Sequence, residues 1–166
     1  VGSPQMQKAH DWAVEKYQSW GIEARNEQWG EWRGWDRGIT HIDMVEPWVR
    51  SLSGMQLAWS PASPQGGAMG EVIVLADLQD SAAFQNWLPN VKGKYVMIST
   101  PQITGRPDYN WEEWATEESF EKMKEDQRAI SRAWGERLRK TGLGRRELPQ
   151  ALEDAGALGI ITSYWS

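Results

Sequence analysis

The 166-residue chain contains no cysteine and only two histidines. The absence of cysteine excludes disulfide bonds, thiolate nucleophiles and thiolate metal sites. No apolar run approaches the roughly 18 residues needed to cross a bilayer, so we expect no membrane span. Positive charge is also in deficit, because 23 acidic residues outnumber 18 basic ones and give a net charge of -5. A nucleic-acid partner is not expected, since phosphate backbones require concentrated positive charge.

Tryptophan is the residue in excess, with 12 in the chain. Two interpretations are open. In the first, which we expect for most of the rings, they fill a core and its rim while each indole N–H finds a hydrogen-bond partner. In the second, some rings form a stacking platform for sugars or for a partner protein. The candidate partner or substrate surface lies in a glycine-interrupted stretch and consists of Trp29, Trp32 and Trp35.

The first part of the chain predicts one helix followed by strands. The helix is expected over 4–20, with Ser3 as its N-cap, a proline at its first position and Gly21 just past its end. Apolar residues recur in it at three- and four-residue spacing, which indicates one face that packs on a core. Residues 22–29 are expected to be extended. Further strands are expected over 38–45 and, from alternation, over 52–59.

The second part of the chain follows a turn-rich connection at 60–67. Its shorter elements are buried β-branched strands and the helices between them. We expect them at 71–76, 81–88, 95–99, 148–155 and 158–163. Residues 101–115 are expected to form a polar loop, and Thr116 to cap a long helix over 116–141. The order predicts an α/β (α+β) fold: a small sheet with packed helices, a long inserted helix and an N-terminal helix.

The sequence contains few candidate catalytic or metal-binding motifs. His41-Ile42-Asp43 is similar to the His-x-Asp pair of several metallopeptidases, because alternate residues of a strand share a face and can meet one ion. No third ligand lies nearby in the sequence, and neither histidine belongs to a His-Glu-x-x-His arrangement. There is no Gly-x-Ser-x-Gly elbow, and the glycine-rich stretch 66–70 lacks the Lys-Ser/Thr pair of a phosphate loop. We therefore assign no catalytic residue and no metal ligand in this chain.

Several segments are similar to a known family. Gly2-Ser3-Pro4-Gln5-Met6 and the Trp20-Gly21 helix stop resemble the opening of secreted zinc exopeptidases of the aminopeptidase and plasma glutamate carboxypeptidase type. The strand at 70–74, the Gly-Lys-led strand at 91–96 and the Ala-Gly-Ala turn within 151–161 resemble, in order and spacing, a protease-associated (PA) domain. The small residues of that turn suit the close packing of a helix on a strand.

The resemblance implies a domain organisation and a parent enzyme. Residues 1–50 would be the N-terminal helix and strands of the peptidase domain, and 51–166 a partial PA-like domain with a helical insertion at about 101–146. In such enzymes the two zinc ions and the catalytic carboxylate lie after the PA domain, so zinc is implied only for the parent and no cofactor for this chain. We expect an incomplete chain, because its last strand lies close to Ser166.

The same resemblance implies partners and a compartment. The partners would be the remainder of the peptidase chain and the peptide substrate of the parent, whose access the PA-like part would shape. The localisation would be secreted or periplasmic. Two other classes of function stay open: a stand-alone module whose tryptophans bind carbohydrate or protein, and a scaffold whose helix over 116–141 docks a partner or a second copy. Whether the chain itself is enzymatic is left open.

Overall fold

The computed structural model describes residues 2–31 and 34–163 and shows a mixed fold of helices and small sheets. The chain divides into two compact units, Val1–Ser63 and Pro64–Ser166. The division falls inside the turn-rich connection that the sequence predicts at 60–67. No helix among the described residues is long and apolar enough to cross a membrane.

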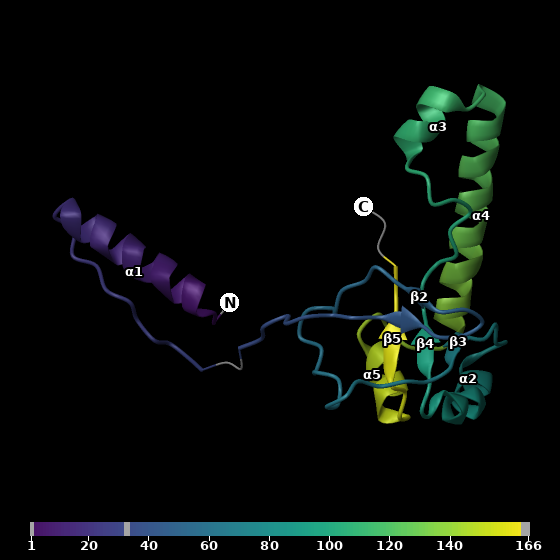
Figure 1. Ribbon diagram of the computed structural model, residues 1–166, viewed down its shortest axis with the longest axis horizontal. Coiled ribbons are helices and arrows are strands. Elements are labelled where there is room, and N and C mark those ends of the chain that lie inside the picture. The colour runs from purple at the N-terminus through teal and green to yellow at the C-terminus, as the bar shows by residue number, and fades with distance from the viewer. Residues whose placement is uncertain (1, 32–33, 164–166) are drawn as a thin grey trace. The chain divides into compact units, whose positions relative to one another are not determined.

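Unit 1 begins with helix α1 (Pro4–Ser19), shown in Figure 1. Its start and end are as predicted: the Ser3 Oγ accepts a hydrogen bond from the backbone N–H of Met6 at 3.2 Å, Pro4 occupies the first position, and Gly21 follows with a φ of +78°. Only glycine adopts that left-handed conformation without steric cost. No residue of α1 is buried. The apolar face of this helix therefore does not enter a core within the described chain, contrary to the prediction.

The strands predicted in unit 1 are mostly absent. β1 (Asp43–Met44) and β2 (Arg50–Ser51) form a short antiparallel pair. The backbone N–H of Leu52 still reaches the carbonyl of Ile42 at 2.9 Å, but the pairing ends there and a turn closes at Ser60. Alternation alone does not make a strand, because backbone donors and acceptors need a partner chain. The predictions of extended strands over 38–45 and 52–59 are therefore wrong for most of their length.

Unit 2 is built on a parallel sheet of β3 (Val72–Val74), β4 (Tyr95–Met97) and β5 (Gly159–Ile161) in the order β3-β4-β5. β3 connects to β4 through α2 (Ser81–Trp87) and the 3-10 helix Leu88–Val91. The Asp80 carboxylate caps α2, as predicted, by accepting from the backbone N–H of Ala83 at 2.8 Å. The three strands lie where the sequence predicts them, although each is shorter than its apolar run.

The core of unit 2 lies on one face of this sheet. Ile73, Val96 and Ile160 are aligned across the three strands and face it. Its buried residues are Leu75, Phe84, Val91, Val96, Trp134, Leu148 and Leu152. On the opposite face Val72 and Val74 remain about half exposed, at 49% and 51%. This is unusual for a parallel sheet, which is normally covered on both faces.

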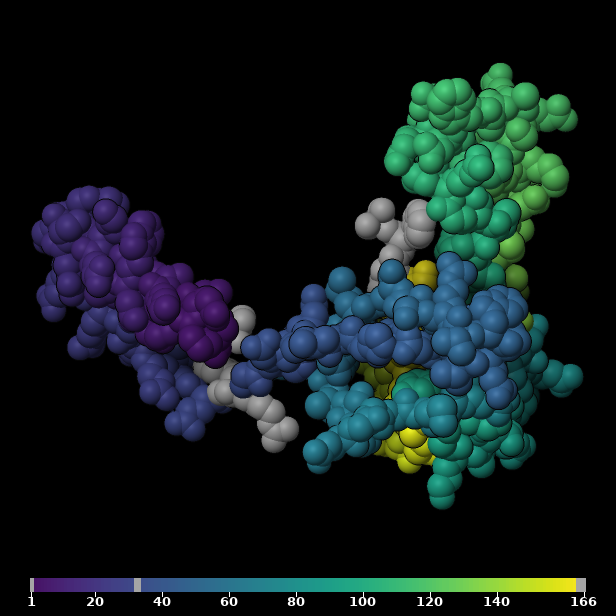
Figure 2. All heavy atoms as spheres, viewed as in Figure 1, coloured from purple at the N-terminus to yellow at the C-terminus, as the bar shows by residue number. Residues whose placement is uncertain are grey.

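The connection from β4 to β5 consists of α3 (Asp108–Trp114), α4 (Glu117–Lys140) and α5 (Glu147–Asp154). Thr116 caps α4, as predicted, with its Oγ1 3.3 Å from the backbone nitrogen of Ser119. The predicted polar loop at 101–115 is wrong in its second half, because α3 forms there and packs on α4. Figures 1 and 2 show α3 and the first half of α4 extending away from the sheet of unit 2 as an arm.

Candidate functional site

A junction of glycines brings the three strands of unit 2 together. An added Cβ on Gly70 would lie 2.5 Å from the Leu158 Cδ1 and 2.8 Å from the Gly93 carbonyl oxygen. The backbone N–H of Gly93 donates to the carbonyl of Gly156 at 2.9 Å. Gly159 lies beside the ring of Tyr95: a Cβ added at Gly159 would lie 3.3 Å from the Tyr95 Cε1. Gly70 therefore needs glycine because its surroundings approach too closely for a Cβ, whereas Gly93 and Gly156 favour glycine because their φ angles are +71° and +87°.

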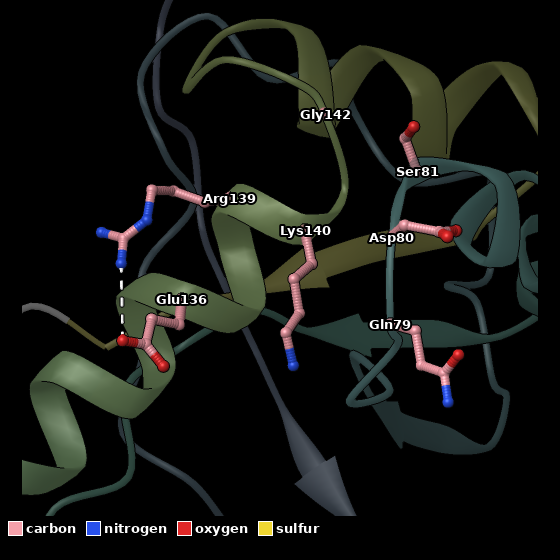
Figure 3. A pocket seen from close by; sticks show the side chains of 7 residues that line it. All are labelled: Gln79, Asp80, Ser81, Glu136, Arg139, Lys140 and Gly142. Carbon is pink, nitrogen blue, oxygen red and sulfur yellow. Dashed lines mark ion pairs between the residues drawn. The ribbon is translucent and has the colours of Figure 1, made fainter.

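A shallow hollow of about 410 Å³ lies between the last turns of α4 and the loop that leads into α2 (Figure 3). Its lining residues are Gln79, Asp80, Ser81, Glu136, Arg139, Lys140 and Gly142. Arg139 pairs with Glu136 at 3.8 Å, and the Asp80 carboxylate is engaged as the cap of α2. The lining includes no histidine and no cysteine, so the hollow offers neither an imidazole base nor a thiolate nucleophile.

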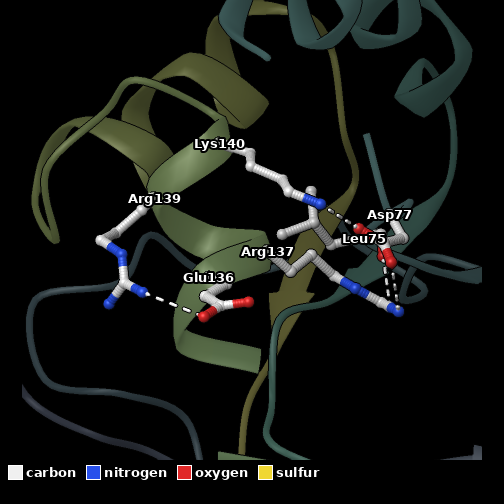
Figure 4. A network of polar contacts seen from close by, with 6 residues as sticks. All are labelled: Leu75, Asp77, Glu136, Arg137, Arg139 and Lys140. Atoms are coloured by element: carbon white, nitrogen blue, oxygen red, sulfur yellow. Dashed lines mark hydrogen bonds and ion pairs between the residues drawn. The ribbon is translucent and has the colours of Figure 1, made fainter. Parts of the chain in front are cut away.

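Beside the hollow, a polar network ties α4 to the end of β3 (Figure 4). The Arg137 guanidinium donates to the carbonyl of the fully buried Leu75 at 3.1 Å and lies 3.9 Å from the Asp77 carboxylate. Lys140 pairs with the same carboxylate at 3.1 Å. Arg137 also lies over the ring of Trp134, 4.9 Å from its centroid. Because a buried carbonyl needs a partner, Arg137 has a structural role here.

The His41-Ile42-Asp43 motif forms a hydrogen-bonded group in unit 1. The Asp43 carboxylate accepts from the Ser51 Oγ at 2.6 Å and from the His41 Nε2 at 2.8 Å. The Ser51 bond, and secondly the His41 bond, lower the pKa of Asp43 below its ordinary value. The hydroxyl bonds the carboxylate and not the imidazole, so this is not the nucleophile-base arrangement of a catalytic triad. Within residues 2–31 and 34–163 no group of three or more His, Asp or Glu could hold a metal ion.

The described tryptophans of the candidate surface differ in their exposure. Trp29 is 83% exposed, whereas Trp35 is half-buried and donates its Nε1–H to the carbonyl of Ser60 at 2.9 Å. Trp32 lies outside the described residues. The ring that lies beside Trp35 is Trp59, with centroids 6.5 Å apart. Trp59 was not among the predicted residues, because no local pattern in the sequence connects it with a residue 24 positions earlier.

The expectation that most tryptophans fill a core and its rim is wrong for the described part of the chain. Trp134 is buried there and Trp35, Trp87 and Trp111 are half-buried, but the other rings are exposed. The exposed rings are Trp12, Trp20, Trp29, Trp48, Trp59 and Trp114. They lie on α1, in the irregular part of unit 1 and on α3, where too few elements pack together to bury a side chain of this size.

Comparisons with known proteins add no relative: no protein-family model, no curated protein and no solved structure matches the chain.

Proposed function

We propose that this chain is a non-catalytic segment of a zinc-dependent exopeptidase, in which the PA-like unit 2 borders the active-site cleft and shapes the access of peptide substrates. The remainder of the peptidase chain is its partner. The parent enzyme is secreted or periplasmic in this proposal, which rests on the resemblance of the sequence segments.

One observation supports the proposal above the others. The three segments that resemble a PA domain are separated in the sequence, but they form the three adjacent strands β3, β4 and β5. Two glycines within these segments are needed for different reasons: Gly70 because an added Cβ would clash with Leu158 and the Gly93 carbonyl, and Gly93 because its φ is +71°. The stretch 101–146, which has no counterpart in the resemblance, forms α3 and α4 between two of the strands. α3 and the first half of α4 make up the arm, whereas the second half of α4 contributes the buried Trp134 to the core of unit 2.

The half-exposed face of the sheet favours a partner. Val72 and Val74 on β3 and Ile161 on β5 each keep more than a third of their surface in contact with solvent. Burial of apolar surface stabilises by about 25 cal/mol per Å². A neighbouring domain that covers this face would gain that free energy, and the remainder of a peptidase chain is such a neighbour.

In this proposal, the zinc ligands and the catalytic residues of the parent enzyme lie outside the described residues. Zinc in such a parent would need sets of His, Asp and Glu ligands around open coordination positions. The described residues, 2–31 and 34–163, do not fit that requirement, because none of them adds a third ligand to His41 and Asp43 and both Asp43 oxygens are engaged. No catalytic step is therefore derived for this chain.

The proposal is tested on the full-length protein that the host produces from its own gene. An affinity tag placed on the genomic copy should recover exopeptidase activity on aminoacyl and dipeptide substrates that a zinc chelator abolishes, whereas the purified 166-residue chain should be inactive. In the tagged protein, Val74→Asp should lower that activity because it places a charge on the sheet face. Val49→Asp is the matched control, since Val49 is exposed outside this sheet. Activity in the isolated chain, or none in the material from the host, would contradict the proposal.

A further inference from the structure

Trp59 occupies a turn that does not suit it. The turn runs from Leu57 to Ser60 and is closed by the hydrogen bond from the Ser60 backbone N–H to the Leu57 carbonyl at 3.2 Å. Trp59 is its third residue and has a φ of +70°. A bulky residue in the left-handed region is a conformational outlier, and such strain is found preferentially at functional sites. The ring that is held there is 61% exposed.

A second tryptophan, Trp35, contacts this turn through a hydrogen bond and a ring contact. The Trp35 Nε1–H donates to the carbonyl of Ser60 at 2.9 Å, one residue beyond Trp59. The Trp35 ring lies 6.5 Å from the Trp59 ring, at an interplanar angle of 37°. Because Trp35 is half-buried and hydrogen-bonded, it fixes the position of its neighbour. The arrangement holds an exposed Trp59 ring in a fixed position, with little conformational freedom left to lose on binding.

A positive charge lies on the same cluster. The Arg37 guanidinium carbon is 5.5 Å from the centroid of the Trp35 ring. Its Nη1 contacts the Met55 sulfur at 3.5 Å, which is a weak acceptor. Across residues 2–31 and 34–163, Arg37 forms no ion pair with a carboxylate. The fork of N–H donors on this side chain matches an external carboxylate.

We propose that the cluster in which Trp35 contacts both Trp59 and Arg37 is a binding site for an acidic oligosaccharide, in which a pyranose ring stacks on Trp59 and the carboxylate of the same or a neighbouring sugar pairs with Arg37. The face of an indole ring is electron-rich and attracts the weakly positive C–H groups of a sugar ring. A proline-rich peptide fits less well, because two rings tilted by 37° do not form a slot with parallel walls. This inference is independent of the proposed exopeptidase function.

Calorimetric titration of the whole chain with hexagalacturonate tests the site, with cellohexaose as the neutral comparator. We expect saturable binding of hexagalacturonate and binding of cellohexaose that is weaker by about tenfold or more, since a charged hydrogen bond is lost. Trp59→Gly should weaken hexagalacturonate binding by about tenfold or more, in the range of a lost stacking contact. Glycine suits the positive φ of this position, so the loss cannot be attributed to a damaged turn.

Two further variants complete the test. Arg37→Gln should reduce the affinity for hexagalacturonate to that for cellohexaose and leave the latter unchanged. Trp48→Ala is the matched control, because Trp48 is exposed to the same extent as Trp59, at 62%, and it should bind as the unaltered protein does. No saturable binding, equal binding of both sugars, equal effects of Trp59→Gly and Trp48→Ala, or tighter binding of a proline-rich peptide that Trp59→Gly abolishes would each overturn the proposal.

Discussion

The glycine junction of unit 2 gives a sharp prediction about stability. In Gly70→Ala the new Cβ would lie 2.8 Å from the backbone carbonyl oxygen of Gly93 and 2.5 Å from the Leu158 Cδ1. The leucine can move, because it is 41% exposed, but the carbonyl belongs to the segment that leads into β4. Overpacking of this kind costs about 1–3 kcal/mol. For a unit of about a hundred residues, 1 kcal/mol lowers the midpoint of thermal unfolding by roughly 4–8 °C.

The assay is thermal denaturation followed by far-UV circular dichroism, with amide hydrogen exchange at β4 to locate the change. Gly105→Ala is the control, because Gly105 has open space around its Cβ position and no positive φ, so it should be neutral or stabilised by about 0.4–1 kcal/mol. Adding Leu158→Ala to Gly70→Ala should restore only part of the loss, since the clash with the carbonyl remains. Equal midpoints for Gly70→Ala and Gly105→Ala would refute the reasoning.

Four more perturbations test the packing and the polar contacts within each unit. Phe84→Ala should cost about 3–5 kcal/mol in urea unfolding, because this ring is fully buried in unit 2, whereas Asp77→Asn should cost under about 1 kcal/mol, because its ion pairs are exposed. Ser51→Ala should raise the pKa of Asp43 toward its ordinary value in an NMR titration, since the Ser51 bond is the main cause of its lowering. The lowered pKa means that Asp43 favours the β1–β2 pairing above the ordinary carboxyl pKa and that this contribution is lost as the pH falls through the lowered value. Added zinc should leave the thermal midpoint unchanged, and a shift would reveal a ligand set that the described residues do not show.

The helices with local end signals could be predicted from the sequence. Ser3, Asp80 and Thr116 each cap a helix as expected, because an N-cap is a contact between residues three positions apart. The strands of unit 2 could be located from β-branched runs, although not their exact lengths. Their adjacency in one parallel sheet follows from the helical connections, since parallel strands need crossovers.

Contacts between distant residues could not be predicted. The helix α3 has only seven residues, and it forms where it can pack on α4, which no pattern within 101–115 indicates. The alternation at 52–59 is real in the sequence, but a strand requires a partner backbone and none is paired with it beyond Leu52. Trp59 is a contact partner of Trp35 across 24 residues, so periodicity carries no signal for it.

The strand predicted from Glu71 to Ala76 is longer than β3, but its composition still indicates how the faces of β3 are covered. Continuous apolar residues, without alternation, are typical of a strand that is covered on both faces. In unit 2 the residue Ile73 faces the core, whereas Val72 and Val74 face outward and remain about half exposed. A strand with only one covered face usually has polar residues at the two outer positions, because contact between water and apolar side chains such as valine is unfavourable. The composition of β3 therefore supports, separately from the resemblance, the proposal that another surface covers this face.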